Sequence, residues 1–485
     1  MAYRHGVYVS EVPTSLVPPV QSDASLPVVV GTAPVNLLDD PSAAVNKPIL
    51  AYSYAEAVEA LGFVPAKNGK FSYSLCEFIK SQFALFAAGP VVLINVLDPA
   101  DHKVDETDEE LAVVAGRVTL PEGTLRASVV VKAQGGTPTY TEGTDYELTL
   151  NEDGSVNIVA LSGGSMPTTG SVLVTYSAID LTAVDANDII GGVDALTGKA
   201  TGLELVNEVF PRYRLVPGQI LAPGFSTDPT VAAVMKAKAA NINGHFRAIS
   251  LVDIPTDSVA QYSDAPAWKN TNNIVDPLEV ACWPMLRFGD ELHHLSTQLA
   301  GLICRTDAAN DGIPYVSPSN KNLQAMATVL EDGTEVFLGP DSAAYLNGEG
   351  IVTGLNFIGG WKAWGNRTAA YPAITDPKDS FLPVRRMLNW IGNTLILTFW
   401  QKVDDPLNRR QIDTVVDSAN VWLNGLAARG AIIGGRVEFL ESENPTTDLM
   451  DGIARFHVYV TPPSPNREID FVLEYDPSYL AGLFG

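Results

Sequence analysis

The sequence predicts a multidomain protein of mixed α/β and α+β class, with strand-like arms at both termini. The first observation is its size: 485 residues, 46% of them hydrophobic, suffice for several separate cores. The second is that short apolar strands alternate with helical patterns on both sides of residues 101–195, which indicates a split α/β domain. The third is that residues 101–195 show only short strand patterns, which indicates an inserted all-β domain.

Charge and composition exclude several classes of protein. The chain has 31 basic and 56 acidic residues, a net charge of −25, which argues against nucleic acid or an anionic membrane as a partner. It has no apolar run of about 18 residues and no apolar segment near Met1, so we expect neither membrane insertion nor secretion. Cys76, Cys282 and Cys304 are widely spaced, as expected of three buried, reduced thiols.

Residues 1–27 have the pattern of an extended arm. Gly6–Val12 alternates as a strand does, but four prolines follow it and no local hairpin partner is apparent. The arm leads into residues 28–100, where strand and helix patterns alternate. The elements expected there are strands at 28–30, 49–53 and 91–97, and helices at 54–61 (capped by Ser53) and 75–86.

Residues 101–195 change in character. This segment holds 16 acidic and 4 basic residues, a net charge of −12, and opens with the acidic run 105–110. The tight-turn sequence Glu152-Asp153-Gly154 separates two of the strands that follow. Those strands are expected near 113–120, 125–134, 145–150, 155–161 and 171–177. We expect a small sandwich that forms a solvated outer module.

Residues 196–375 return to the α/β pattern and are expected to complete the domain begun at residue 28. Strands at Gln219–Ala222 and Arg247–Ile254 flank a helix at Pro229–Asn241, which predicts a right-handed βαβ unit. A further helix is expected at 290–305.

Residues 376–466 are predicted to form an α+β domain. The expected elements are helices at 381–401 and 406–429 and strands at 431–440 and 453–461. The second helix carries a long apolar face. Asp405 is its expected N-cap, with Pro406 in its first turn and Gly430 directly after its end.

Residues 467–485 follow a proline-rich spacer and are predicted to be a second strand arm. Ile469, Phe471 and Leu473 alternate with Asp470, Val472 and Glu474, a period-two pattern that is typical of a strand.

We find no pattern that indicates catalysis, a cofactor or a metal site. The sequence around Gly198-Lys199 fails as a P-loop, because Val193 stands where the first glycine belongs and Ala200 where the hydroxyl residue belongs. His293 and His294 are adjacent, so on a helix they would diverge; we expect both to be ordinary surface or interface residues.

Two strand arms without internal partners have unpaired backbone groups, which are costly to leave exposed. If each arm is donated to a sheet of a neighbouring copy, the contacts are head-to-tail and generate rings or open helical polymers. The sequence therefore favours a polymerising structural protein, although the same arms would also suit a dimer in which they clasp each other.

A family resemblance rests on segments that run almost from end to end of the chain. They are HGVYVSEVPTS at 5–15, LPVVVGTAP at 26–34, GPVVLINVLDP at 89–99, VDALTGKATGLE at 193–204, QILAPGFS at 219–226, FRAISLVDIP at 246–255, RTDAANDGIPYVSPSN at 305–320, LNGEGIVTGLNFIGGWKAWGNRT at 346–368, FLPVRRMLNWI at 381–391 and RFHVYVTPPSPNREIDFVLEY at 455–475. In this order they resemble the contractile bacteriophage tail sheath protein family of the myovirus type.

This resemblance implies a fold and a set of partners. It implies an inner domain, built from the N-terminal arm and residues after about 376, that faces a tail tube. The split α/β part would lie further out. Residues 101–195, which only some members possess, would be outermost. Val7, Tyr8 and Val9 of one arm and Ile469, Phe471 and Leu473 of the other would link copies into stacked hexameric rings. Lys402, Arg409 and Arg410 are the candidate contacts to the tube.

The resemblance also implies a function. The sheath would assemble in the host cytoplasm, belong to the virion tail, and contact the baseplate and tail terminator proteins. Its contraction would drive the tube through a bacterial envelope, without cofactor or ATP. A tailocin sheath is the alternative within this class. A soluble α/β enzyme with an acidic β domain, or a binding module led by that domain, is the alternative from another class.

Overall fold

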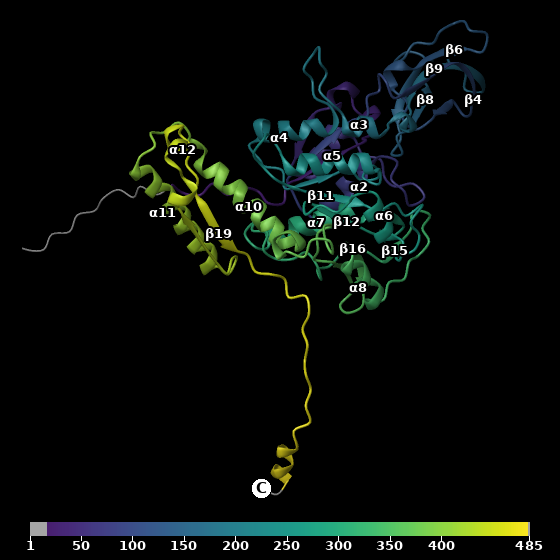
Figure 1. Ribbon diagram of the computed structural model, residues 1–485. Helices are drawn as coiled ribbons and strands as arrows, with labels where there is room; N and C mark the ends of the chain where they lie inside the picture. The colour runs from purple at the N-terminus through teal and green to yellow at the C-terminus, as the bar shows by residue number, and fades with distance from the viewer. Residues whose placement is uncertain (1–16, 484–485) are drawn as a thin grey trace, which may run out of the picture.

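The computed structural model describes residues 17–483 and is built around one eight-stranded sheet (Figure 1). Its strands are β1 (Pro27–Gly31), β2 (Pro48–Ala51), β3 (Val91–Asn95), β10 (Gln219–Leu221), β11 (Ile249–Asp253), β12 (Glu279–Cys282), β16 (Ile351–Asn356) and β17 (Trp361–Trp364). They lie in the order β17-β16-β12-β11-β10-β1-β3-β2. The six inner strands are parallel, and β2 and β17 add antiparallel edges. The inner strands read as near-continuous apolar runs because both faces of the sheet are covered.

Helices cover the two faces. They are α1 (Tyr54–Leu61), α2 (Ser74–Ile79, continued by a π-helical segment Lys80–Leu85), α3 (Ala186–Ile190), α4 (Val206–Tyr213), α5 (Pro229–Ala240), α6 (Ala265–Thr271), α7 (Leu295–Ala308) and α8 (Pro340–Gly348). The predicted βαβ unit is confirmed as β10, α5 and β11, with Asp228 as the N-cap of α5. Helix α7 begins later than predicted, because Glu291–His293 forms a short strand, β14, that pairs with β13 (Met285–Phe288). The third strand of that small sheet is β15 (Ala327–Val329).

Residues 103–179 contain two three-stranded antiparallel sheets that project from the rest of the molecule (Figure 1). The sheets are β4-β9-β6 and β5-β8-β7. Their strands are β4 (Lys103–Val113), β5 (Arg117–Leu120), β6 (Val130–Ala133), β7 (Tyr146–Leu150), β8 (Val156–Ala160) and β9 (Gly170–Ile179). A separate apolar cluster, which includes Val131, Ile158 and Val174, forms their core.

The acidic run 105–110 was expected to precede the strands of this segment, and this expectation is wrong. It lies within β4, the longest strand of the segment, with a register shift between Glu106 and Glu109. Neighbouring side chains bind its carboxylates: Lys132 pairs with Asp108 at 2.7 Å, and Tyr176 donates to Glu109 at 2.8 Å. Because the acidic side chains are mostly solvated and several have partners, they do not prevent strand pairing.

The C-terminal part is a helical pair packed on a hairpin. Its elements are α9 (Pro377–Ser380), α10 (Leu382–Phe399), α11 (Arg409–Ala428), α12 (Thr446–Met450), β18 (Gly434–Glu438) and β19 (His457–Thr461). Trp390, Trp422 and Leu423 lie at the centre of its core. The predicted 381–401 helix and the two strands are confirmed, and a 3-10 turn extends α10 to Lys402.

The predicted start of α11 is wrong. Its N-cap is Asn408, whose side chain accepts a hydrogen bond from the Gln411 N–H at 3.0 Å, whereas Asp405 lies in the preceding loop and pairs with Lys402. A cap binds the N–H two or three residues further on, and Asn408 is the residue so placed. The predicted end is confirmed: Gly430 follows the helix with a φ of +76°.

Candidate assembly surfaces

The chain after β19 is a tail that extends away from the body (Figure 1). Residues 464–476 form no helix and no strand, so the predicted strand at 468–475 is absent from the single chain. A β-strand exists only where a second strand completes its hydrogen bonds, and the described chain offers this segment none. Pro477–Leu483 forms a short 3-10 helix at its end.

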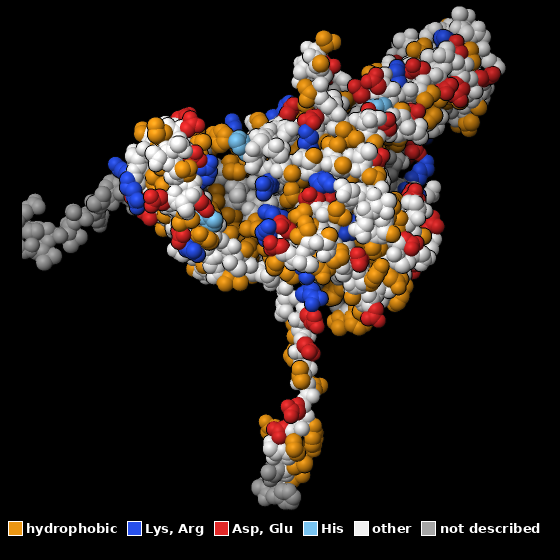
Figure 2. Space-filling model, viewed as in Figure 1, with side chains coloured by type: hydrophobic (Ala, Val, Ile, Leu, Met, Phe, Trp, Pro, Cys, Tyr) orange, Lys and Arg blue, Asp and Glu red, His pale blue; other side chains and the backbone are white. Residues whose placement is uncertain are grey.

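The apolar side chains of the tail face solvent. Ile469, Phe471 and Leu473 are 67%, 82% and 94% exposed. Figure 2 shows these apolar side chains interspersed with acidic ones along an isolated stalk. Exposing these apolar side chains to water costs free energy, and such exposure is typical of a segment that a partner covers.

The hairpin β18–β19 has one blocked edge and one open edge. The Asn420 side chain accepts from the Val437 N–H at 2.8 Å and donates to the Val437 carbonyl at 3.0 Å. It therefore satisfies the outward backbone groups of Val437, and so blocks that part of β18 on the side away from β19. Within residues 17–483, β19 has β18 as its one strand neighbour, so the far edge of β19 has unpaired backbone groups.

The two faces of the hairpin differ. Val437, Val458 and Val460 pack toward the core formed with α10 and α11. On the other face the Arg436 guanidinium lies 3.9 Å from the centre of the Tyr459 ring. A strand added to β19 would therefore meet an apolar face on one side and, on the other, the Tyr459 ring and an Arg436–Glu438 ion pair with an N–O distance of 2.8 Å.

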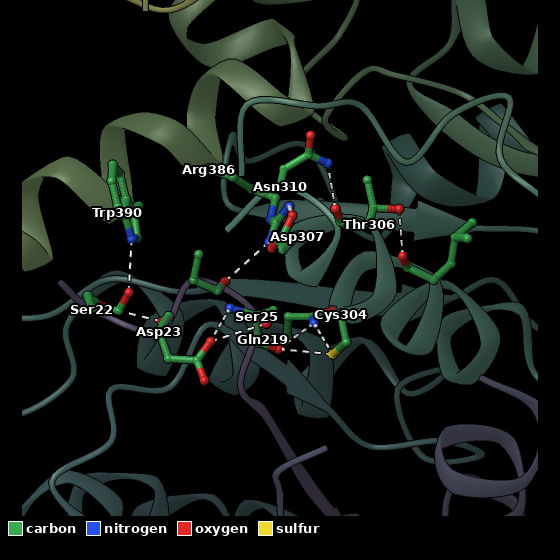
Figure 3. A network of polar contacts seen from close by, with 12 residues as sticks. Ser22, Asp23, Ser25, Gln219, Cys304, Thr306, Asp307, Asn310, Arg386 and Trp390 are labelled. Carbon is green, nitrogen blue, oxygen red and sulfur yellow. Dashed lines mark hydrogen bonds and ion pairs between the residues drawn. The ribbon is translucent and has the colours of Figure 1, made fainter. Parts of the chain in front are cut away.

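A strap formed by residues 17–26 ties the C-terminal helices to the central sheet. The N–H of Val17 donates to Ser418 Oγ at 2.8 Å, and the N–H of Val20 donates to Thr398 Oγ1 at 3.0 Å. Trp390 Nε1 donates to the Ser22 carbonyl at 2.9 Å (Figure 3). At its end the strap enters the sheet as β1. The backbone of the strap is thus held by side chains of α10 and α11 instead of by a sheet.

A buried ion pair lies beside the strap (Figure 3). The Arg386 guanidinium, on α10, contacts both carboxylate oxygens of Asp307, on α7, and also donates to the Ala24 carbonyl at 3.2 Å. The side chains are 3% and 1% exposed. Gln219 Nε2, at the start of β10, donates to the Ser25 carbonyl at 2.7 Å. Sequence patterns did not reveal this cluster, since its members are far apart in the chain.

The three cations proposed as tube contacts lie between the end of α10 and the first turn of α11. Lys402 is held there because Gln411 Nε2 donates to its carbonyl at 3.1 Å. Lys402 pairs with Asp405 at 3.1 Å, and Arg409 pairs with Asp413 at 2.9 Å while its side chain stays 84% exposed. Arg410 is exposed. Trp400 and Val403, 58% and 64% exposed, add apolar surface nearby. The other predicted arm residues, Val7, Tyr8 and Val9, lie outside the described residues.

A polar cluster lies at the carboxyl ends of β10 to β12, where α/β sheets often bind ligands. It borders a hollow of about 220 Å³. Asp253 accepts from the Ser296 N–H at 3.1 Å, and Glu77 accepts from the His294 N–H at 2.7 Å. Both carboxylates thus cap the first turn of α7.

His294 completes this cluster with Nδ1 2.8 Å from Glu77 Oε2. Burial opposes its charge, but the adjacent Glu77 carboxylate raises the pKa of His294 to about 9. Burial likewise opposes the charge of Glu77, yet His294 holds the pKa of that carboxyl below its usual value. The expectation of ordinary surface histidines is wrong: His294 is 20% exposed and His293 is fully buried. The cluster fastens α7 to α2 and β11.

The other sequence candidates for chemistry have structural roles. Residues 193–199 form an exposed loop, with Leu196 96% exposed, and not a phosphate-binding turn. The three cysteines are free and buried, as predicted, and burial raises the pKa of Cys76 and Cys304 to about 12. Within residues 17–483 there is no group of three or more potential metal ligands and no helix long and apolar enough to cross a membrane.

Comparisons with known proteins point to one family. Residues 52–187 match a family described as "Protein of unknown function UCP028589". A tail sheath protein of Burkholderia phage BcepMu is 30% identical over 500 residues, covering 100% of this chain and 99% of the phage protein. A major tail sheath protein of Serratia phage KSP20 is 26% identical over 171 residues, covering 35% of this chain and 42% of that protein.

The fold is similar to that of solved sheath structures. The contracted sheath complex of an extracellular contractile injection system, PVC, matches with a TM-score of 0.59 at 14% identity, covering 99% of both chains. The contracted helical sheath of the anti-feeding prophage matches with a TM-score of 0.56 at 14% identity, covering 98% of this chain and 100% of that chain. The full-length match to the Burkholderia phage protein goes further than fold. The chain therefore belongs to the contractile phage tail sheath family.

Proposed function

We propose that this chain is the repeating subunit of a contractile tail sheath, and that copies are linked by exchange of terminal segments. The observation that carries the proposal is the tail, whose alternating apolar side chains are exposed and whose backbone has no strand partner within residues 17–483. Burying Ile469, Phe471 and Leu473 would contribute roughly 1.5–3 kcal/mol each. A second copy of the chain supplies the partner.

The open edge of β19 is the proposed receiver. A donated strand on that edge would direct its apolar side chains toward the core side of the hairpin, beside Val458 and Val460. Its acidic side chains would then lie on the side of the Tyr459 ring and the Arg436–Glu438 ion pair. Because Asn420 already binds the outward backbone groups of Val437 in β18, the edge of β19 is the better receiver of the two. Val7, Tyr8 and Val9 are the proposed donor residues of the N-terminal arm.

We assign the parts of the chain to layers of the sheath. Residues 1–27 are the N-terminal arm and 376–466 the inner domain, whose Lys402, Arg409 and Arg410 face the tail tube. Residues 28–100 with 196–375 form the middle domain, and 101–195 the outer domain. Residues 467–485 are the C-terminal arm. The net charge of −12 in the outer part would keep the surface of the assembly soluble.

The role is mechanical and not enzymatic. Hexameric rings would stack around the tube in the host cytoplasm, between the baseplate and a terminator, in an extended state that is a kinetic trap. Exchanged strands tether neighbours, so subunits would rotate and move outward on contraction without separating. The contraction drives the tube through the bacterial envelope.

Disulfide trapping tests strand exchange. Tyr459→Cys is paired in turn with single cysteines at positions 468 to 476 of the tail, and mild oxidation is followed by non-reducing electrophoresis. The native thiols are buried, so background reaction is low. We expect crosslinks between copies, with a higher yield at every second position along the tail. An absence of crosslinks at every tail position would contradict donation to β19.

A further inference from the structure

A basic groove lies beside the root of the tail. Two adjoining hollows of about 550 and 520 Å³ share Val316, Asn320 and Lys321 in their walls. The cations of this groove are Arg305, Lys321, Lys362, Arg367 and Arg467. No Asp or Glu lines either hollow. In a chain of net charge −25, five cations in walls that contain no acid are unexpected. One of them, Arg467, pairs with the adjacent Glu468 at 3.0 Å. Figure 2 shows basic side chains where the tail leaves the body.

Four of the five cations have no carboxylate partner in the described part of the chain. Arg305 donates to the Asn322 carbonyl at 2.9 Å, and Lys362 to the side chain of Asn322. Arg367 is stacked between rings, 4.2 Å from the centre of Tyr371 and 3.8 Å from that of Phe381. Burial lowers the pKa of Arg367, and the charge of Arg467 acts in the same direction. A bound anion would relieve this repulsion.

The tail carries a matching set of acids. Glu468, Asp470, Glu474 and Asp476 occupy even-numbered positions, with Val472 between the two pairs, so in an extended strand all four point to the face opposite Ile469, Phe471 and Leu473. Asp470 and Glu474 have no cation within 4.0 Å in residues 17–483. The acids of β4 are a poorer match, because Asp105, Asp108, Glu109 and Glu110 already bind neighbouring side chains.

The groove also begins a few residues after the strand proposed as the receiving edge. Strand β19 ends at Thr461, and Pro465, Asn466 and Arg467 already form part of the groove wall. Four extended residues span about 13 Å. A strand of seven residues, 469–475, is longer than β19, which has five. Its overhanging end would therefore pass toward the groove.

From these observations we infer that the basic groove binds the acidic face of the C-terminal tail of a second copy. This inference rests on the proposed function and adds to it a second contact, with opposite charges on the two partners. If the tail runs parallel to β19, Glu474 and Asp476 reach the groove; if it runs antiparallel, Glu468 and Asp470 reach it. The contact selects the tail and fixes its register, since β-strand pairing by backbone groups alone specifies neither.

Charge reversal in the full-length chain tests this inference. Lys321→Glu with Lys362→Glu reverses the groove, and Glu474→Lys with Asp476→Lys, or Glu468→Lys with Asp470→Lys, reverses one end of the tail. Lys321 is exposed, and Lys362 donates only to a side-chain oxygen, so folding should be retained; circular dichroism checks this. Lys199→Glu is the matched control, because Lys199 is exposed and lines neither hollow. The readout is the critical concentration for polymer formation, by sedimentation.

We expect groove reversal to raise the critical concentration at least threefold and Lys199→Glu to leave it within twofold of the wild-type value. One of the two tail reversals should restore assembly when it is combined with groove reversal. Unchanged assembly of the groove variant, or failure of both tail reversals to restore it, would overturn the inference. A chain truncated after Pro465 separates the two proposals: if it does not polymerise while the groove variant does, strand donation stands and the groove contact falls. If the truncated chain polymerises, the proposed strand donation by the C-terminal tail itself fails.

Discussion

Arg386 of α10 and Asp307 of α7 form an ion pair that is shielded from solvent, with Arg386 Nη1 3.1 Å from Asp307 Oδ1. The same guanidinium binds the Ala24 carbonyl, so one side chain joins the C-terminal helices, the central α/β part and the N-terminal strap. A load applied to the N-terminal arm would therefore reach both parts of the body.

Removing one member of this pair should be strongly destabilising. Arg386→Met leaves the Asp307 carboxylate buried without a partner, and we expect a loss of about 3–5 kcal/mol in the free energy of unfolding. Urea denaturation measures it. The double variant Arg386→Met with Asp307→Leu should be more stable than the single variant, because no buried charge remains. A double variant as unstable as Arg386→Met would show that the cost comes from lost packing.

The Glu77–His294 pair predicts a pH dependence. The pKa of His294 rises from 6.5 to about 9 on folding, so its contribution is complete below pH 6.5 and is lost as the pH rises through 9. The contribution of Glu77, whose pKa is lowered, is present above its ordinary value of 4.5 and is lost in acid. The shift of the His294 pKa, from 6.5 to about 9, corresponds to about 3 kcal/mol.

The measurement compares wild-type and His294→Gln chains by urea denaturation at pH 5, 7 and 10. We expect the wild type to be the more stable by about 3 kcal/mol at pH 7 and the difference to shrink by pH 10. A difference that stays constant between pH 7 and pH 10 would mean that His294 is neutral in the folded chain.

Helix α11 offers a matched pair of cap variants. Asn408→Ala removes the hydrogen bond to the Gln411 N–H and should cost about 1 kcal/mol. Asp405→Ala removes only a solvent-exposed contact with Lys402 and should cost less than about 0.5 kcal/mol. Thermal unfolding of both variants distinguishes them. Equal losses, or a greater loss for Asp405→Ala, would contradict the observed start of the helix.

The cations at the start of α11 give a prediction about the tube. Arg409→Glu with Arg410→Glu should reduce co-sedimentation with purified tail tubes at least fivefold while leaving self-assembly unchanged, because both residues are exposed and Arg409 pairs only within its own helix. Lys199→Glu again serves as the control. Unchanged tube binding would exclude this end of α11 from the tube contact.

Local patterns in the sequence predicted most regular elements. The apolar runs at Val28 and Val91 and the βαβ unit around α5 were correctly predicted, since strand burial and helix capping depend on neighbouring residues. The predicted elements were wrong where residues distant in the sequence determine the local structure. The acidic run is a strand because β9 pairs with it, and α7 begins late because β13 pairs with Glu291–His293.

The candidate site was predicted in part. The alternation of Ile469, Phe471 and Leu473 indicated a strand donor, but a donor has no ladder in an isolated chain, so the structure has an exposed tail there instead. The blocked edge of β18 depends on Asn420, 17 residues away, and the strap depends on hydroxyls nearly 400 residues away. No local pattern shows such contacts.

The central claim is that terminal arms link copies into a sheath. Negative-stain electron microscopy of the purified full-length chain, beside a chain truncated after Pro465 and a Phe471→Asp, Leu473→Asp variant, tests it most directly. We predict long hollow helical tubes for the full-length chain and folded, unassembled subunits for both variants. Tubes formed equally well by the truncated chain would contradict the account.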